Sequence, residues 1–251
     1  MDIVQDFYDS MAGSYDRLFE DWTAATKNQA QILDRLFRDF GFDRGSRLLD
    51  CACGIGTQSI GLAELGYRVT ASDYSRGELA EAEKRALERG VQVRLAWADF
   101  RRLEDVFQET FDIVIAMDNA LPHMLSEEDL ETAVKSMAGR VRKGGIFAAS
   151  IRDYDRLLEE KPPYSPPYIH KTEYGKRVSF QTWDWLEDHY RLTQYIIEDG
   201  PSLKISKFDS EYRAVKREAL TALLLKAGFT DVEWKFREET GFYQPVVIGI
   251  R

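Results

Sequence analysis

From residue 47 to residue 151 the chain alternates between short apolar runs and stretches with helical periodicity. The runs are rich in valine, isoleucine, leucine and aromatic residues and lie at 47–51, 68–72, 91–96, 111–117 and 146–151. The clearest helical stretch, 126–141, opens with the capping pair Ser126 and Asp129 and carries an apolar stripe. Strands that alternate with helices form a parallel sheet covered on both faces, so this pattern predicts a doubly wound α/β fold.

Helical patterns precede this alternation. Large apolar residues between Phe7 and Trp22 recur at helical spacing, which predicts one helical segment. A second apolar stripe, 32–40, ends at Gly41, a residue typical of helix C-termini. We therefore expect residues 1–45 to form an N-terminal helical cap.

After the fifth run the pattern changes. Residues 161–168 hold four of the seven prolines, which predicts an extended loop that cannot join a strand ladder because proline lacks the amide donor. Three strand-like runs between 178 and 212 predict an antiparallel insertion. A last helix over 216–227 precedes two further strand-like runs, 231–237 and 246–250, which we expect to rejoin the main sheet.

Together these segments predict a mostly parallel, seven-stranded, Rossmann-like α/β sheet with N-terminal helices and a small antiparallel β insertion after the fifth strand. A chain of 251 residues is short enough to be built around one main core. The expected divisions are a helical cap (1–45), a Rossmann-like core (46–155), a loop and insertion on the substrate side (156–213), and a final helix with two strands that complete the sheet (214–251).

Bulk composition disfavours several partners. The chain carries 34 Lys and Arg against 43 Asp and Glu, a formal net charge of -9, and a field of this sign repels nucleic-acid phosphates. No long apolar run and no signal-peptide pattern occur, so no membrane partner is expected. The two cysteines, Cys51 and Cys53, are poorly spaced for an unstrained disulfide, which favours a cytoplasmic location.

A turn of small residues follows the first predicted strand. Residues 50–56 read Asp-Cys-Ala-Cys-Gly-Ile-Gly, and Ala52, Gly54 and Gly56 let a ligand approach the backbone closely. Dinucleotide-binding enzymes use a similar turn, but their pattern places a third glycine where this chain has Ser59. The turn therefore indicates a nucleoside-type ligand and leaves a dinucleotide as the alternative.

Carboxylates follow the next two predicted strands. Asp73 ends the second strand, where a carboxylate can accept hydrogen bonds from both hydroxyls of a ribose. Asp99 and Phe100 end the third, where the carboxylate can accept from an adenine amine and the ring can cover the base. Each residue alone is as readily a loop carboxylate or a helix cap. Their placement at successive strand ends predicts one nucleoside pocket.

In its element order the chain resembles the class I S-adenosylmethionine-dependent methyltransferases, most clearly from the turn at 50–56 to the loop at 142–145. It departs from the family pattern at Ala52, which replaces a glycine, and at Arg142 and Lys143, which replace a proline before paired glycines. The resemblance implies S-adenosylmethionine as the cofactor. Because the leaving group of a sulfonium is neutral, no metal is expected. The residues implied for cofactor binding are Tyr15, Trp22, Asp50, Ala52, Gly54, Gly56, Asp73, Tyr74, Asp99, Phe100 and Met117.

Two further segments, 117–124 and 150–155, look most like those of glycine and glycine/sarcosine N-methyltransferases. By this resemblance Asn119 and His123 line the reaction centre, and Arg152 binds the carboxylate of an amino acid. The planar guanidinium suits that task because it can bind a carboxylate through two parallel hydrogen bonds.

Ordinary structural explanations stand beside these roles. Arg152 can instead form a salt bridge with a neighbouring aspartate, and His123 can be a packed loop histidine. Tyr168 and Tyr174 are candidates for acceptor binding that loop packing would equally explain.

The resemblance implies methyl transfer to the amine of an amino acid or of a similar small molecule that bears a carboxylate. The alternatives are O- or C-methylation of a secondary metabolite, or binding of S-adenosylmethionine without catalysis. Modification of RNA is disfavoured because the chain has no basic stripe. A homo-oligomer stays open, because the N-terminal helices can close the chain's own pocket or exchange between subunits.

Overall fold

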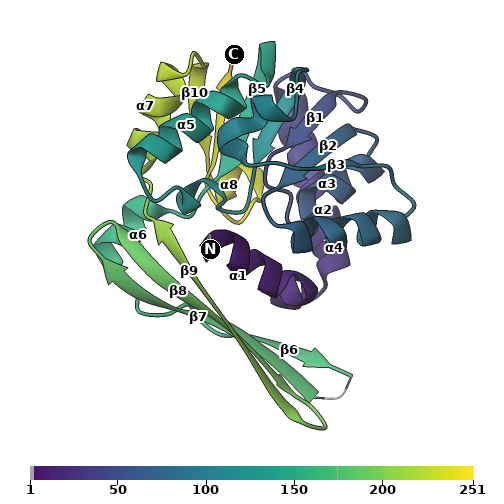
Figure 1. Ribbon diagram of the computed structural model, residues 1–251, viewed down its shortest axis with the longest axis vertical. Helices are drawn as coiled ribbons and strands as arrows, with labels where there is room; N and C mark the ends of the chain where they lie inside the picture. Colours follow the sequence, from purple (N-terminus) through teal and green to yellow (C-terminus); the bar gives the residue numbers. More distant parts are fainter. Residues whose placement is uncertain (1–2, 174) are drawn as a thin grey trace.

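The computed structural model describes residues 3–173 and 175–251. In these residues seven strands form one sheet in the order β10-β11-β5-β4-β1-β2-β3 (Figure 1). Strands β1 to β5 pair in parallel, whereas β11 and β10 are antiparallel. The bounds are β1 Arg47–Asp50, β2 Arg68–Asp73, β3 Arg94–Trp97, β4 Phe111–Ala116, β5 Val141–Ser150, β10 Thr230–Lys235 and β11 Val246–Ile250. The predicted Rossmann-like α/β fold is confirmed.

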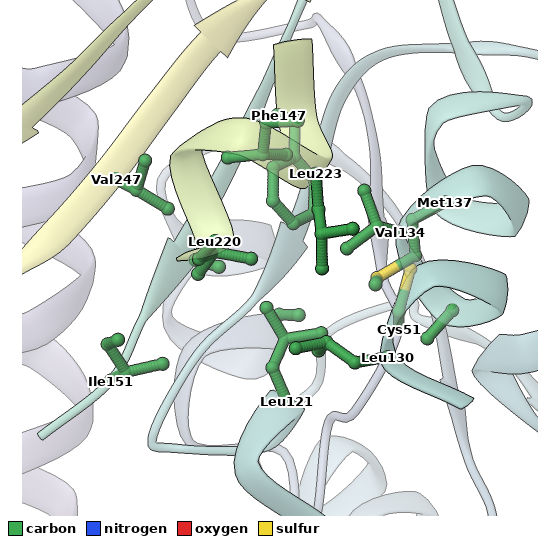
Figure 2. Packing of buried hydrophobic residues seen from close by; sticks show 14 of the residues in the cluster. Cys51, Leu121, Leu130, Val134, Met137, Phe147, Ile151, Leu220, Leu223 and Val247 are labelled. Carbon is green, nitrogen blue, oxygen red and sulfur yellow. The ribbon is translucent and has the colours of Figure 1, made fainter. Parts of the chain in front are cut away.

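Helices cover both faces of this sheet. The helices of the described residues are α1 Ile3–Met11, α2 Trp22–Asp39, α3 Thr57–Glu64, α4 Arg76–Glu88, α5 Glu127–Ala138, α6 Tyr154–Glu160, α7 Arg217–Lys226 and α8 Arg237–Thr240, with 3₁₀ segments η1 Ala12–Leu18, η2 Phe100–Asp105 and η3 Leu121–His123. Figure 2 shows Leu220 and Leu223 of α7 packed near Phe147 of β5, within a larger apolar cluster on that face. A second cluster buries Leu33 and Phe37 of α2 against the opposite face. These two layers hold the strand ends in fixed positions.

The N-terminal region departs from its predicted single helix. The segment divides into α1 and the 3₁₀ turn η1, and Gly13 and Ser14, which are weak helix formers, lie just after the division. In Figure 1 helix α1 lies between the main sheet and the second sheet. Phe7 of α1 meets Phe208 of the second sheet, with ring centroids 6.5 Å apart. The first helix therefore bridges the two sheets at the side where strands β1, β2 and β4 end.

The second sheet is antiparallel, in the order β6-β7-β8-β9, and extends away from the main sheet (Figure 1). Its strands are β6 Tyr168–Thr172, β7 Gly175–Leu186, β8 His189–Asp199 and β9 Leu203–Arg213. The expectation that the proline-rich loop stays outside any ladder was wrong. Tyr164 forms an isolated bridge with Thr182, and the Pro163 carbonyl accepts a hydrogen bond from the Trp183 amide at 2.8 Å. Proline lacks a donor, but its carbonyl and its neighbours still pair.

Glycine at position 61 lets α3 pack closely on α2. A Cβ atom there would lie 2.7 Å from both the Ala30 Cβ and the Thr26 carbonyl oxygen. We expect Gly61→Ala to lower the free energy of unfolding by about 2 kcal/mol, because the two helices must separate. Chemical denaturation measures this change. Gly13→Ala is the matched control, since its Cβ would meet no atom within 4 Å; equal midpoints for the two variants would contradict the close approach.

Candidate active site

A cavity of about 250 Å³ lies at the carboxyl ends of β1, β2 and β4. Its lining includes eight of the residues predicted for cofactor binding and one predicted for the reaction centre. These are Tyr15, Ala52, Gly54, Asp73, Tyr74, Asp99, Phe100, Met117 and His123. Ligands bind at this edge of open α/β sheets because the strand-to-helix loops diverge there. The structure therefore brings most of the predicted residues together around one space.

The turn after β1 is built for close approach to its backbone. Gly54 and Gly56 have φ angles of 51° and 89°, values that favour glycine. Asp50 is fully buried beneath the turn and accepts hydrogen bonds from the Ala52 amide at 3.3 Å and the Ser59 hydroxyl at 2.6 Å. Burial raises the pKa of Asp50 to about 7. Neither Asp50 nor Gly56 lines the cavity, so their part is to shape the turn.

Asp73 sits at the end of β2 with its carboxylate already oriented. One oxygen accepts from the Gly54 amide and the other from the Ser75 amide, both at 2.8 Å. Each carboxylate oxygen has a second lone pair, so both can still accept from a ligand in the cavity. Burial raises the pKa of this carboxyl to about 6.

Asp99 has a cation as its neighbour. The guanidinium of Arg101 donates to both Asp99 oxygens, at 3.0, 2.9 and 2.6 Å, and also to Asp129 at 3.2 Å. A ligand amine that binds Asp99 would therefore share its carboxylate with Arg101. Phe100 follows directly and lines the same part of the cavity.

A carboxylate that we did not predict for the site, Asp118, also lines the cavity. One oxygen accepts from the Tyr243 hydroxyl and the other from the Gln58 amide, both at 2.7 Å. Asp118 and Asn119 both have left-handed φ angles, 55° and 70°. The sequence could have indicated this residue only as a carboxylate after the fourth strand. Its two hydrogen-bond partners are distant in the chain, so no local pattern predicts them.

His123 is a buried wall of the cavity. Its Nε2 forms a 2.8 Å hydrogen bond with the Tyr8 hydroxyl, and its ring lies 4.1 Å from that of Tyr212. Burial lowers the pKa of His123 to about 3, and the charge of Arg152 acts in the same direction. A histidine with this pKa is neutral and weakly basic near neutral pH, so its environment suits hydrogen bonding better than proton abstraction.

Arg152 and Asn119 are not among the lining residues of this cavity. Asn119 Oδ1 accepts from the Arg152 backbone amide at 3.1 Å and from the Tyr154 hydroxyl at 3.0 Å. The Arg152 side chain donates to the Tyr190 hydroxyl and to Gln181 Oε1, both at 2.9 Å. No ion pair joins Arg152 to a carboxylate in the described residues. The neighbouring aspartates, in contrast, pair with Arg217.

Aromatic rings surround the Arg152 guanidinium. Its central carbon lies 5.0 Å from the centre of the Trp183 ring and 5.6 Å from that of Tyr212. Since Tyr212 also contacts His123, one layer of aromatic rings separates Arg152 from the cavity wall.

Three further predicted residues lie away from the cavity or outside the described residues. Trp22 is buried in a small apolar cluster and donates to the Thr57 hydroxyl at 3.0 Å. Arg85 lies 4.6 Å from the centre of its ring. Tyr168 is 61% exposed on β6, in the second sheet. Tyr174 lies outside the residues that the structure describes.

Helix α1 forms part of the cavity wall. Ile3, Val4, Gln5 and Tyr8 line the cavity from this helix. Asp9 fixes the helix by accepting hydrogen bonds from the Ser75 hydroxyl and the Gly77 amide, at 2.5 and 2.8 Å. The sequence predicted the helix but not its position over the strand ends. In the described residues no three metal-ligating side chains cluster, and no helix is long and apolar enough to cross a membrane.

Comparison with known proteins agrees with this geometry. A family model described as a methyltransferase domain matches residues 48–145. The glycine/sarcosine N-methyltransferase of Parasynechococcus marenigrum (strain WH8102) is 33% identical over 62% of this chain, a match that spans 54% of that relative. The enzyme of the same name from Aphanothece halophytica is 25% identical over 90% of this chain and 81% of its own length. The family model and these relatives support a class I S-adenosylmethionine-dependent methyltransferase.

The fold of this methyltransferase is shared along its length with solved structures. A crystal structure of an S-adenosylmethionine-dependent methyltransferase from Clostridium acetobutylicum ATCC 824 aligns with a TM-score of 0.74. The alignment covers 96% of this chain and 97% of that one at 19% identity. At that identity the likeness establishes the fold. The methyltransferase domain and the relatives named as methyltransferases support an enzyme that uses S-adenosylmethionine as its cofactor.

Proposed function

We propose that this methyltransferase transfers a methyl group to the nitrogen of an amino acid or a similar small amine that bears a carboxylate. The observation that carries the proposal is Arg152, a guanidinium enclosed by aromatic rings without a carboxylate partner in the described residues. Withdrawing a guanidinium from water without a counter-ion costs desolvation free energy, and a bound carboxylate would offset that cost. The names of two relatives, glycine/sarcosine N-methyltransferase, point to the same class of acceptor.

The residues around the cavity fit the cofactor. The proposal assigns the ribose hydroxyls to Asp73, whose oxygens keep free lone pairs, and the adenine to Asp99 and Phe100. Gly54 lines the cavity with a φ angle of 51°, a conformation that favours glycine, so the cofactor can approach the backbone of the turn there. Tyr15 and Met117 line the same cavity and complete the assignment.

The bound cofactor supplies an electrophilic methyl group on a cationic sulfur. The chain's own residues then need to align donor and acceptor and to exclude water. Helix α1 closes one side of the cavity, and Tyr8 and His123 form a hydrogen-bonded wall beside it. The acceptor nitrogen must give up its proton before it attacks the methyl group, because only the neutral amine has a free lone pair. His123 is assigned to positioning, because its lowered pKa makes it a poor base.

The test combines binding with an acceptor panel. We expect calorimetry to give micromolar binding of S-adenosylhomocysteine, of the order typical for small ligands. In assays that detect S-adenosylhomocysteine release, glycine, sarcosine and larger amino acids are compared with methylamine, which lacks the carboxylate. The proposal predicts a kcat/KM at least about tenfold higher for a carboxylate-bearing amine than for its carboxylate-free counterpart.

Other outcomes would contradict the proposal in distinct ways. A preference for phenols or other carboxylate-free acceptors would favour O- or C-methylation of a secondary metabolite. Tight binding of S-adenosylhomocysteine without turnover on any acceptor would favour a non-catalytic binding protein.

A further inference from the structure

The lining of the cavity carries an excess of negative charge. Its acidic residues are Asp73, Asp99, Asp118 and Asp129, and its basic residue in the described chain is Arg101. Arg101 is already bonded to both Asp99 and Asp129. Asp73 and Asp118 therefore face the cavity without a cationic partner among the described residues. Such a cavity attracts a cation.

Asp118 is held in place by neutral groups only. Its two oxygens accept hydrogen bonds from the Tyr243 hydroxyl and the Gln58 amide, each at 2.7 Å. Gln58 is itself fixed, because the same nitrogen lies 2.6 Å from Gln29 Oε1. Two donors leave each carboxylate oxygen a further lone pair. Burial raises the pKa of Asp118, and the hydrogen bonds from Tyr243 and Gln58 act in the opposite direction.

The backbone at this position is strained. Asp118 and Asn119 are consecutive residues other than glycine with left-handed φ angles, 55° and 70°. Such conformations cost on the order of 1 kcal/mol or more each and persist where surrounding contacts impose them. The Ser150 hydroxyl accepts from the Asp118 amide at 2.8 Å, and the Ser150 carbonyl accepts from the Asn119 amide at 3.0 Å. The fold thus maintains this turn and directs the Asp118 side chain to the cavity.

A purely structural role does not account for the charge. An asparagine at this position could bond the same two neighbours without the cost of burying an ionised group. We propose that the Asp118 carboxylate binds the ammonium group of a ligand in this cavity. The inference rests on the proposed function, which supplies two such groups: the ammonium of the cofactor's amino-acid moiety and the amine of the acceptor before it loses its proton.

The experiment compares wild type with Asp118→Asn by calorimetry, using S-adenosylhomocysteine and 5′-methylthioadenosine. The second compound keeps the nucleoside but lacks the amino-acid moiety. If Asp118 binds the cofactor's ammonium, the variant should bind S-adenosylhomocysteine about tenfold or more weakly and 5′-methylthioadenosine with unchanged affinity. If it binds the acceptor's amine, both nucleosides should bind unchanged and the acceptor KM should rise by about tenfold or more.

Two results would overturn the inference. One is equal weakening of both nucleosides, which indicates a general loss of the pocket; the other is no change in either affinity and no change in KM. If the wild type methylates no amine, the proposed function fails. The affinities of wild type and Asp118→Asn for the two nucleosides then decide by themselves whether Asp118 binds an ammonium group. Unchanged affinity for both would reject it.

Two controls separate binding from folding. Without ligand, Asp118→Asn should melt at a temperature equal to or above that of wild type, because an uncompensated charge has been removed. Asp129→Asn is the matched variant: this carboxylate also lines the cavity but is paired with Arg101. It should leave the ratio of the two nucleoside affinities unchanged.

Discussion

Asp73→Ala is expected to weaken binding of S-adenosylhomocysteine by about 100-fold or more. Two charge-assisted hydrogen bonds to ribose hydroxyls are worth about 1.5–3 kcal/mol each, and each 1.4 kcal/mol is a factor of ten in affinity. The same carboxylate holds the amides of Gly54 and Ser75, so its loss also loosens the turn beneath the cofactor. Calorimetry measures the affinity.

Asp73→Asn and Asp39→Ala complete this experiment. Asparagine keeps one acceptor oxygen and the shape of the side chain, so we expect an intermediate loss of affinity. Asp39 is exposed at the end of α2, and its replacement should leave binding unchanged. Binding of S-adenosylhomocysteine to Asp73→Ala at wild-type affinity would remove Asp73 from the cofactor site.

The affinity should also depend on pH with a defined sign. The pKa of Asp73, raised to about 6 by burial, places its ionised form above that pH. Acceptance of two ribose hydroxyls requires the ionised carboxylate, so affinity should fall as the pH decreases through about 6.

Asp73 also links folding stability to pH. Its pKa in the folded protein lies above the usual value of 3.8, so folding favours the protonated carboxyl. The stabilisation of the folded state by this group is therefore present at low pH and lost as the pH rises through about 6.

Features set by neighbouring strands could be predicted from the sequence. Asp73 ends β2 and Asp99 follows β3, and these two strands pair in parallel, so strand order alone brings both residues to one edge of the sheet. The Ser126 cap is a local feature and is confirmed: its hydroxyl accepts from the Asp129 amide at 3.0 Å. Local patterns and the sheet's regular geometry were sufficient for these residues.

Features set by distant contacts could not be predicted. Gln58 and Tyr243 lie 60 and 125 residues from Asp118, and no local pattern relates these positions. Helix α1 has an ordinary apolar stripe, which predicts a helix but not the Asp9 contacts that place it over the cavity. Trp22 is the opposite case. The family resemblance assigns this residue to the cofactor site, but here its side chain packs in an apolar cluster.

The acceptor side of the proposal is tested most directly at Arg152. We expect Arg152→Ala to raise the KM of a carboxylate-bearing acceptor by about 100-fold or more, because loss of a buried charge partner costs about 2–5 kcal/mol. Affinity for S-adenosylhomocysteine should stay within about threefold of wild type, since Arg152 does not line the cavity. Steady-state kinetics and calorimetry measure the two quantities separately.

Arg152 also has a structural role that the variants must separate from binding. Its hydrogen bonds to Tyr190 and Gln181 join the end of β5 to the second sheet, so Arg152→Ala should also melt at a lower temperature. Arg152→Lys keeps the charge but loses the planar fork, and should leave KM well above wild type. Added methylguanidine should lower the KM of Arg152→Ala if the missing group contacts the carboxylate. Arg191 is the matched control, because it pairs with Glu211 on β9 and its side chain is 58% exposed. An unchanged KM in Arg152→Ala would mean that the guanidinium only connects the two sheets through its hydrogen bonds, and would favour an acceptor without a carboxylate.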